Sequence, residues 1–232
     1  MDFNDSMTSG AAVTDGDALI RSILANPADD APRLVYADWL EEHGRGEDAE
    51  FIRVQVELAH LGFDGGFHTD ERGRLRHSPP HVATLTERQM ELWFDNHGRP
   101  DLPAAMANWP VYPANTPGIR LRVRRGFIER LACPGDEFLA VAAELFARQP
   151  ITHVRLSDRQ SINQGGGFAW FCTGVWKQLV DDVPAELWPH LARDDQPMVT
   201  YATSDEADAA LGRACLRYGR LLVGLPDRPE GD

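Results

Sequence analysis

GIRLRVRRGFIERL, residues 118–131, decides the fold class, because the spacing of apolar residues changes there from helical to alternating. Three apolar residues alternate with three arginines in its first half: Ile119, Leu121 and Val123 with Arg120, Arg122 and Arg124. Such alternation predicts a β-strand with one buried face. The dipeptide Arg125-Gly126 can turn the chain into a second strand over residues 127–131.

A helix and a third strand are predicted to follow. Residues 137–149 carry one apolar stripe at helical spacing, and residues 151–156 (ITHVRL) are predicted to form a strand. Ile128 and Ile151 begin similar apolar patterns 23 residues apart, within the range of leucine-rich units. Because such units need about three copies to bury a core, two interpretations stay open: a degenerate leucine-rich-like β-α-β unit, or one βαβ crossover with chance spacing.

Four helices are predicted before these strands, from their apolar spacing and their capping residues. They cover about residues 15–25, 33–43, 47–60 and 84–96. In the second helix we expect one buried face, formed by Val35, Tyr36, Trp39 and Leu40. Gly44 follows that helix at the position where a left-handed residue usually ends one.

The chain is therefore predicted to be α+β, with a helical head followed by a small mixed sheet that has helices on one face. We expect a disordered tail over residues 1–14, because its polar residues lack periodicity. The helical domain is placed at residues 15–100, with a Gly- and His-rich loop at 62–82, and the α+β domain at residues 118–226.

The first helices resemble a known bacterial family. Asn26-Pro27, the block RLVYADWLEE at residues 33–42 and EFIR at residues 50–53 resemble the repeat-companion domain, over about residues 16–61. This family often lies beside leucine-rich-like repeats, and residues 125–158 look like the strand-helix-strand that follows it. The resemblance implies an architecture and a place beside an interaction surface, and it implies no enzymatic activity.

Composition restricts the partners. The chain has 232 residues, with 23 Lys and Arg against 36 Asp and Glu, which gives a net charge of −13. Such a chain repels nucleic acid and anionic lipid unless its basic groups are concentrated. Three separated cysteines without a C-x-x-C motif (Cys133, Cys172 and Cys215) indicate free thiols and a cytoplasmic location. We see neither a signal peptide nor an apolar stretch long enough to span a membrane.

One concentrated basic feature offers a binding site. Arg120, Arg122, Arg124 and Arg125 would place guanidinium groups along a strand, a geometry that suits phosphates or an acidic peptide. The alternative use is internal. Residues 27–50 carry eight acids against only Arg33 and Arg45, and this acidic segment could cover the arginines.

Other chemical candidates have simpler structural explanations. Asp38 could be a shielded acid–base group, or a packing residue paired with Arg33 or Arg53. His68, His77 and His81 match no common zinc spacing, so loop histidines are the simpler interpretation. Cys172 would need His153 or His190 as a base, but its apolar neighbours indicate an inert core thiol. We expect no catalytic residue, metal site or cofactor.

The leading functional prediction is a noncatalytic protein-interaction or scaffold module whose partner is another protein. One alternative is an enzyme, for example a hydrolase, with a site that the sequence does not reveal. A second alternative is a phosphate or nucleic-acid binder that uses the arginine strand, which the acidic net charge disfavours.

Overall fold

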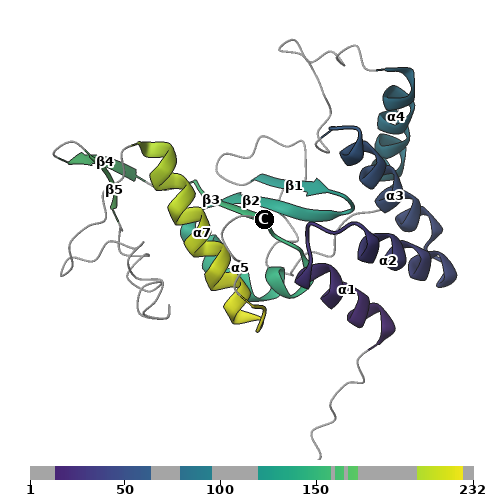
Figure 1. The fold of residues 1–232 in the computed structure, drawn as a ribbon, viewed down its shortest axis with the longest axis horizontal. Helices are drawn as coiled ribbons and strands as arrows, with labels where there is room; N and C mark the ends of the chain where they lie inside the picture. Colours follow the sequence, from purple (N-terminus) through teal and green to yellow (C-terminus); the bar gives the residue numbers. More distant parts are fainter. Residues whose placement is uncertain are drawn as a thin grey trace, which may run out of the picture.

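A computed structural model describes residues 14–63, 79–95, 120–157, 160–164, 167–171 and 203–226. In these ranges the chain is α+β, as predicted, with helices first and a small mixed sheet after them (Figure 1). The helices are α1 (Asp15–Ala25), α2 (Ala31–Glu42), α3 (Gly46–His60), α4 (Pro80–Phe94), α5 (Gly135–Arg148) and α7 (Ser204–Leu222). The strands are β1 (Arg120–Arg124), β2 (Phe127–Cys133), β3 (His153–Leu156), β4 (Gln160–Gln164) and β5 (Gly167–Phe171).

Polar side chains begin α1 and α2, and a glycine follows α2. Thr14 accepts a hydrogen bond from the Asp17 amide, and the Asp17 carboxylate accepts one from the Thr14 amide, so a capping box begins α1. The Asp29 carboxylate accepts a hydrogen bond from the Ala31 amide at the start of α2. Gly44 has a φ of 77° just after α2, as expected for a left-handed C-terminal residue.

The buried face of α2 was predicted wrongly at Val35. This side chain is 51% exposed, whereas Arg33 is completely buried and Leu40 is 1% exposed. Arg33 and Leu40 are seven residues apart and so share one side of a helix, while Val35 lies about 200° around the axis from Arg33. Helix α2 therefore directs the charged side chain of Arg33 toward the interior. Apolar spacing alone does not predict this orientation of the helix.

Helix α4 starts within the segment predicted to be a loop. Pro80 is at its beginning, where the missing amide of proline costs no helical hydrogen bond. The loop prediction for residues 62–82 is therefore wrong from Pro80 onward, and residues 64–78 lie outside the described residues. Helix α4 packs against α3 through a small apolar cluster that contains Val54, Leu58 and Val82.

The main sheet has the strand order β1-β2-β3. Strands β1 and β2 are antiparallel and adjacent in sequence, and β2 and β3 are parallel and connected through α5. The predicted βαβ crossover is confirmed, and the leucine-rich interpretation of it stays a prediction. Val123 pairs with Ile128 and Arg122 pairs with Arg130, so Glu129 is an extra residue on β2. Glu129 thus forms a β-bulge, and β4 and β5 form a separate antiparallel pair.

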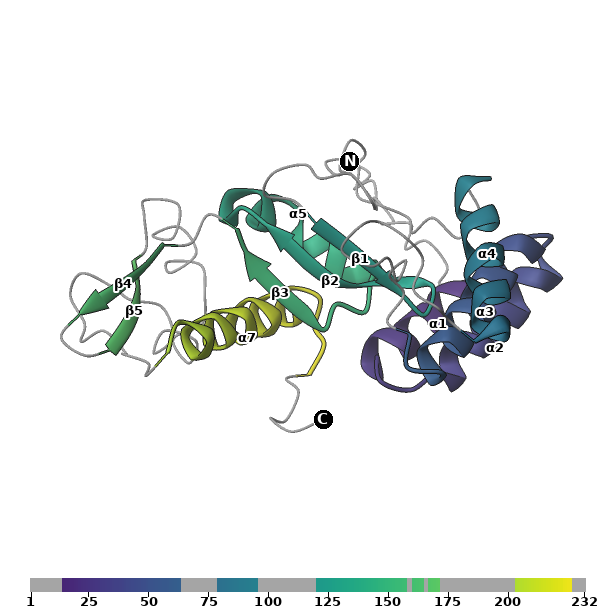
Figure 2. The same ribbon diagram turned by 90° about the horizontal axis from the view of Figure 1, so that it is seen from above.

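Helices α5 and α7 pack with the sheet around the largest apolar cluster (Figure 2). Two glycines on one side of α7 allow this close approach. A Cβ at Gly212 would lie 2.6 Å from the Val154 carbonyl oxygen of β3, and one at Gly219 would overlap the Phe146 ring of α5. The same cluster includes residues from the predicted helical domain, Phe51, Leu92 and Trp93. The boundary predicted between residues 100 and 118 lies outside the described residues.

The turn between β1 and β2 gives a test of this packing. Gly126 has a φ of 85°, and a Cβ there would overlap the Ile52 side chain of α3. We expect Gly126→Ala to lower the free energy of unfolding by about 3 kcal/mol, because backbone strain and overpacking add. Gly44→Ala is the matched control, since Gly44 has a φ of 77° but no atom within 4 Å of the added Cβ.

In Gly44→Ala only the backbone strain of a left-handed alanine applies, so we expect the free energy of unfolding to fall by about 1 kcal/mol. Denaturant unfolding of the two variants measures the difference. Equal losses would show that Gly126 is not in tight contact with α3.

Candidate functional site

The register of the sheet brings basic side chains together on the face away from the α5 and α7 core. Arg122 on β1 pairs with Arg130 on β2, and Arg130 pairs with His153 on β3. The adjacent row is Arg120, Ala132 and Arg155. We call this surface the basic face and define it by six residues: Arg120, Arg122, Arg124, Arg130, His153 and Arg155. Leu121, Val123 and Leu131 of the same strands are in the core cluster, so the predicted alternation of β1 is confirmed over the described residues.

The basic face concentrates positive charge in an acidic protein. Arg120, His153 and Arg155 are exposed, and Arg122, Arg124 and Arg130 are half-buried. Residues directly opposite each other on neighbouring strands have Cβ atoms about 5 Å apart, and like charges in such positions destabilise a sheet. Sequence reasoning missed His153 and Arg155 as members of this site, because their placement depends on how β3 pairs with β2.

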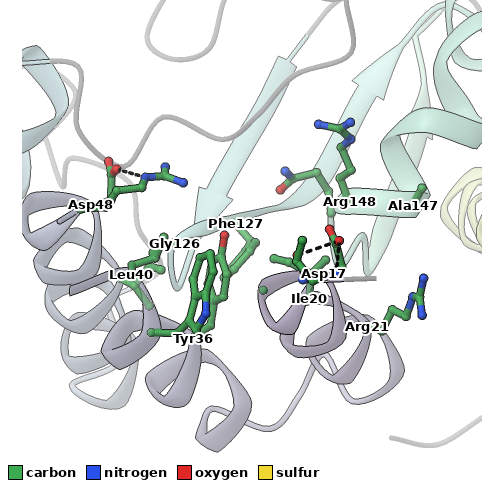
Figure 3. A pocket seen from close by; sticks show the side chains of 16 residues that line it. Asp17, Ile20, Arg21, Tyr36, Leu40, Asp48, Gly126, Phe127, Ala147 and Arg148 are labelled. Atoms are coloured by element: carbon green, nitrogen blue, oxygen red, sulfur yellow. Dashed lines mark hydrogen bonds and ion pairs between the residues drawn. The ribbon is translucent and has the colours of Figure 1, made fainter. Parts of the chain in front are cut away.

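A recess of about 390 Å³ lies near the other end of the hairpin (Figure 3). It is formed by α1, α2, the β1–β2 turn and the C-terminal end of α5, together with the beginning of α3. Aromatic and aliphatic side chains line one part of it, including Tyr36, Trp39 and Phe127. Arg21 and Arg148 stand at another part, near Asp17.

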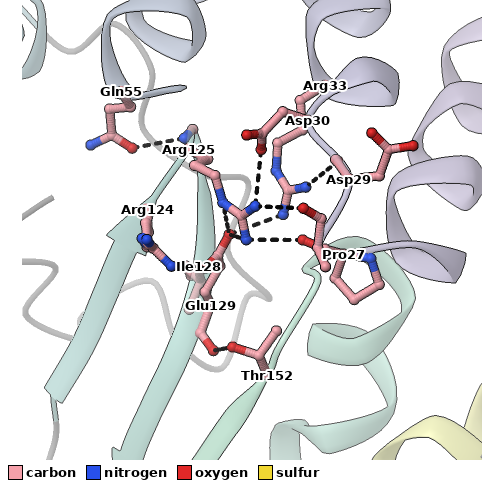
Figure 4. Close-up of polar contacts among 12 residues, drawn as sticks. Pro27, Asp29, Asp30, Arg33, Gln55, Arg124, Arg125, Ile128, Glu129 and Thr152 are labelled. Carbon is pink, nitrogen blue, oxygen red and sulfur yellow. Dashed lines mark hydrogen bonds and ion pairs between the residues drawn. The ribbon is translucent and has the colours of Figure 1, made fainter. Parts of the chain in front are cut away.

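Arg125 is separated from the other predicted binding arginines. It follows β1 in a left-handed conformation with a φ of 52°, and only 8% of it is exposed. Its guanidinium group donates hydrogen bonds to the Glu129 carboxylate, the Asp30 carboxylate and the carbonyl oxygens of Pro27 and Ala28 (Figure 4). The internal alternative therefore holds for Arg125, and we leave it out of the basic face.

Glu129 forms ion pairs with three arginines: Arg33 and Arg125 in the interior, and the half-buried Arg124 of β1, whose Nη1 atom lies 3.9 Å from Glu129 Oε2. Its Oε1 atom lies 2.7 Å from Arg125 Nη2 and 2.9 Å from Arg33 Nη2. Arg33 also donates to the Asp29 carbonyl oxygen at 2.8 Å. Burial lowers the pKa of Arg33 to about 10, so the guanidinium stays protonated at neutral pH. Burial raises the pKa of Glu129, and the Arg125 and Arg33 guanidinium groups oppose that rise.

The spacing of Ile128 and Leu131 is a sequence signal for this network. Ile128 and Leu131 both enter the core, although residues three apart fall on opposite faces of a regular strand. An extra residue between them is required to put both on one face, and the bulge at Glu129 supplies it. The polar residue at that bulge was therefore a candidate for an interior ion pair.

Asp38 is not the shielded acid that one interpretation predicted. Its side chain is 67% exposed, and its Oδ1 atom lies 2.7 Å from Arg53 Nη2. Arg53 also contacts Glu41 at 2.6 Å. The alternative, a carboxylate paired with Arg53, is confirmed, and the pair links α2 to α3.

Only some of the histidine and thiol candidates named from the sequence lie within the described residues. His81 Nε2 lies 2.7 Å from Glu57 Oε1, while His68, His77, Cys172 and His190 lie outside the described residues. Within the described ranges, no group of three or more His, Cys, Asp or Glu side chains is arranged to hold a metal ion. Burial raises the pKa of the Cys215 thiol to about 12, which keeps it protonated and unreactive. None of the helices in these ranges has the length and apolar character needed to cross a membrane.

Comparisons with known proteins do not identify the chain. No protein-family model, no curated protein and no solved structure matches it. The resemblance of residues 16–61 to the repeat-companion domain therefore stays a prediction.

The buried network predicts a clear difference in stability between two charge changes. We expect Glu129→Gln to lower the free energy of unfolding by about 3–5 kcal/mol, because it leaves Arg33 buried without its ion pair and Arg125 with Asp30 as its remaining counter-charge. Arg120→Gln, which changes an exposed residue, should stay within about 0.5 kcal/mol of the native protein. Urea unfolding followed by fluorescence measures both values, and equal stability of the two variants would contradict a structural role for Glu129.

The two described cysteines provide a second test. Cys133 and Cys215 are free and buried, so neither should react with a thiol reagent while the protein is folded. A Cys172→Ser variant removes the third thiol from the measurement. We expect no modification under native conditions and two modified thiols in denaturant. Rapid modification of the folded variant would show that one of these thiols is accessible.

Proposed function

We propose that the protein is a noncatalytic interaction module that binds an acidic segment of a partner protein on the basic face. The single observation behind this proposal is the register that aligns Arg122, Arg130 and His153 in one row, with Arg120 and Arg155 beside it. No fold relative supports this assignment, so it depends on the geometry of these side chains.

The spacing of the arginines suits an extended peptide. Alternate residues of a strand are about 6.5–7 Å apart, so Arg120, Arg122 and Arg124 form a ladder with that repeat. An extended partner with an acid at every second position has the same repeat, and guanidinium groups bind carboxylates through paired hydrogen bonds. Base-specific contacts are not offered by such a ladder, and the net charge of −13 opposes the approach of a long polyanion.

The chemistry of the face favours binding over catalysis. Guanidinium groups remain charged at neutral pH and do not exchange protons with a substrate, so they supply electrostatic attraction and hydrogen-bond donors. The backbone that carries the ladder is held at one end, because Arg125, which follows β1, donates hydrogen bonds to four acceptors. The strand itself therefore needs no ordering when a partner binds.

A cytoplasmic location belongs to the same proposal. The buried free thiols of Cys133 and Cys215 are compatible with a reducing compartment. The resemblance to the repeat-companion domain, which often lies beside an array of repeats, also supports an interaction role.

Binding of model peptides tests the proposal. We expect a peptide of alternating Glu and Thr to bind, and its Gln-Thr counterpart not to bind. The double variant Arg120→Gln/Arg155→Gln should weaken binding about tenfold with an unchanged melting temperature, because both side chains are exposed. Raising the salt from 0.05 to 0.3 M should also weaken binding, since screening shortens the range of the attraction.

The double variant Arg21→Gln/Arg148→Gln is the charge-matched control. Both of its residues line the recess rather than the sheet, so peptide affinity should be nearly unchanged. Equal loss of affinity in the two double variants would mean that only net charge matters. A single-stranded oligonucleotide of equal charge that binds more tightly than the peptide would favour the nucleic-acid alternative.

A further inference from the structure

The recess between α1, α2 and the end of α5 has an aromatic part. The rings of Tyr36 and Trp39 are stacked with centroids 5.7 Å apart and an interplanar angle of 10°, and the Phe127 ring is 6.0 Å from Tyr36. Ile20 and Ile52 add aliphatic surface beside them. These side chains come from three helices and a strand: Ile52 and Phe127 belong to a buried apolar cluster, and Ile20, Tyr36 and Trp39 pack against it.

The opposite part of the recess carries two cations, Arg21 and Arg148, whose charges act on Asp17. Arg21 of α1 and Arg148 of α5 are exposed, and in the described part of the chain neither makes a hydrogen bond or an ion pair. Asp17 lies near both, but its carboxylate is already engaged by the amide and hydroxyl of Thr14. Figure 3 shows Arg21 and Arg148 on the side of the recess away from Tyr36.

The remaining charges leave the recess with a small positive excess. Arg45 is paired with Asp48 at 2.8 Å. The lining therefore includes the charged groups Arg21, Arg45, Arg148, Asp17 and Asp48. Three cations and two anions favour a ligand with one negative charge over a ligand with two.

We propose that this recess binds a small monocarboxylate that carries a planar apolar ring. The ring lies against the wall of Tyr36, Trp39 and Phe127, and the carboxylate accepts hydrogen bonds from Arg21 and Arg148. The volume of about 390 Å³ is within the range of small-molecule sites. Aromatic walls bind planar rings well, and guanidinium groups bind carboxylates through charge-assisted hydrogen bonds.

This site is independent of the basic face. Arg120 begins β1 and Gly126 follows its other end, so the two residues are about 20 Å apart along an extended chain. Gly126 lines the recess, whereas Arg120 does not. Variants of one site can therefore be measured with little effect on the other.

Calorimetric titration with matched probes tests the proposal. The probes are benzoate, phenylacetate and indole-3-acetate, each compared with its neutral amide, and phenyl phosphate as the doubly charged analogue. We expect at least one carboxylate to bind with a Kd below about 1 mM and its amide to bind at least tenfold more weakly. Arg21→Gln and Arg148→Gln should each raise that Kd about five- to tenfold, and Ala147→Phe should fill the recess and abolish binding.

Arg120→Gln is the control and should leave the Kd within about twofold, because it removes the same charge from an exposed position outside the recess. Circular dichroism verifies that every variant is folded. The proposal is overturned if none of the carboxylates binds below about 10 mM, or if the amides bind equally well. It is also overturned if Arg120→Gln weakens binding as much as Arg148→Gln, or if phenyl phosphate binds more tightly than the carboxylates. Loss of peptide binding in Arg120→Gln/Arg155→Gln, with carboxylate binding retained, would separate this site from the proposed function.

Discussion

The ion pairs from Glu129 to Arg33 and Arg125 are the interaction on which the rest of the structure depends. They connect α2, the segment before it and the β1–β2 hairpin, which are distant in sequence. Burying three charges is expensive, and the cost is offset only when the donors are well matched with acceptors. Here the carbonyl oxygens of residues 27–29 and the Asp30 carboxylate accept further hydrogen bonds from Arg33 and Arg125, and among these donors only Arg33 Nε has no partner in the described residues. The orientation of the first helices relative to the sheet follows from that geometry.

Local pattern was sufficient to predict most of the fold. Alternation in residues 118–124 predicted β1, and Gly44 marked the end of α2 nearly correctly. The prediction was wrong at Val35, because apolar spacing ranks Val above Arg for a buried position. Only the partner on β2, 96 residues away, makes Arg33 the better interior residue, and no local pattern contains that information.

The candidate sites were harder to predict than the elements that carry them. The arginines of β1 were visible as a pattern within one strand, but Arg130, His153 and Arg155 join them only through strand pairing. Arg125 is an arginine next to the ladder but does not belong to the basic face. The chain turns at this residue, which has a left-handed conformation, and its side chain is directed into the interior. The recess was not predicted at all, since its walls come from separate segments that no motif connects.

The two glycines of α7 have a consequence for how the protein is made. Gly212 and Gly219 let α7 pack tightly against β3 and α5, so the largest apolar cluster is complete only when α7 has docked. This helix is at the C-terminal end of the described residues and is synthesised after everything it covers. During translation, the apolar sides of β3 and α5 are therefore exposed until α7 has been synthesised. Incompletely folded chains with exposed apolar surface are prone to aggregate. A ribosome that stalls before residue 204 would hold a chain unable to finish its core.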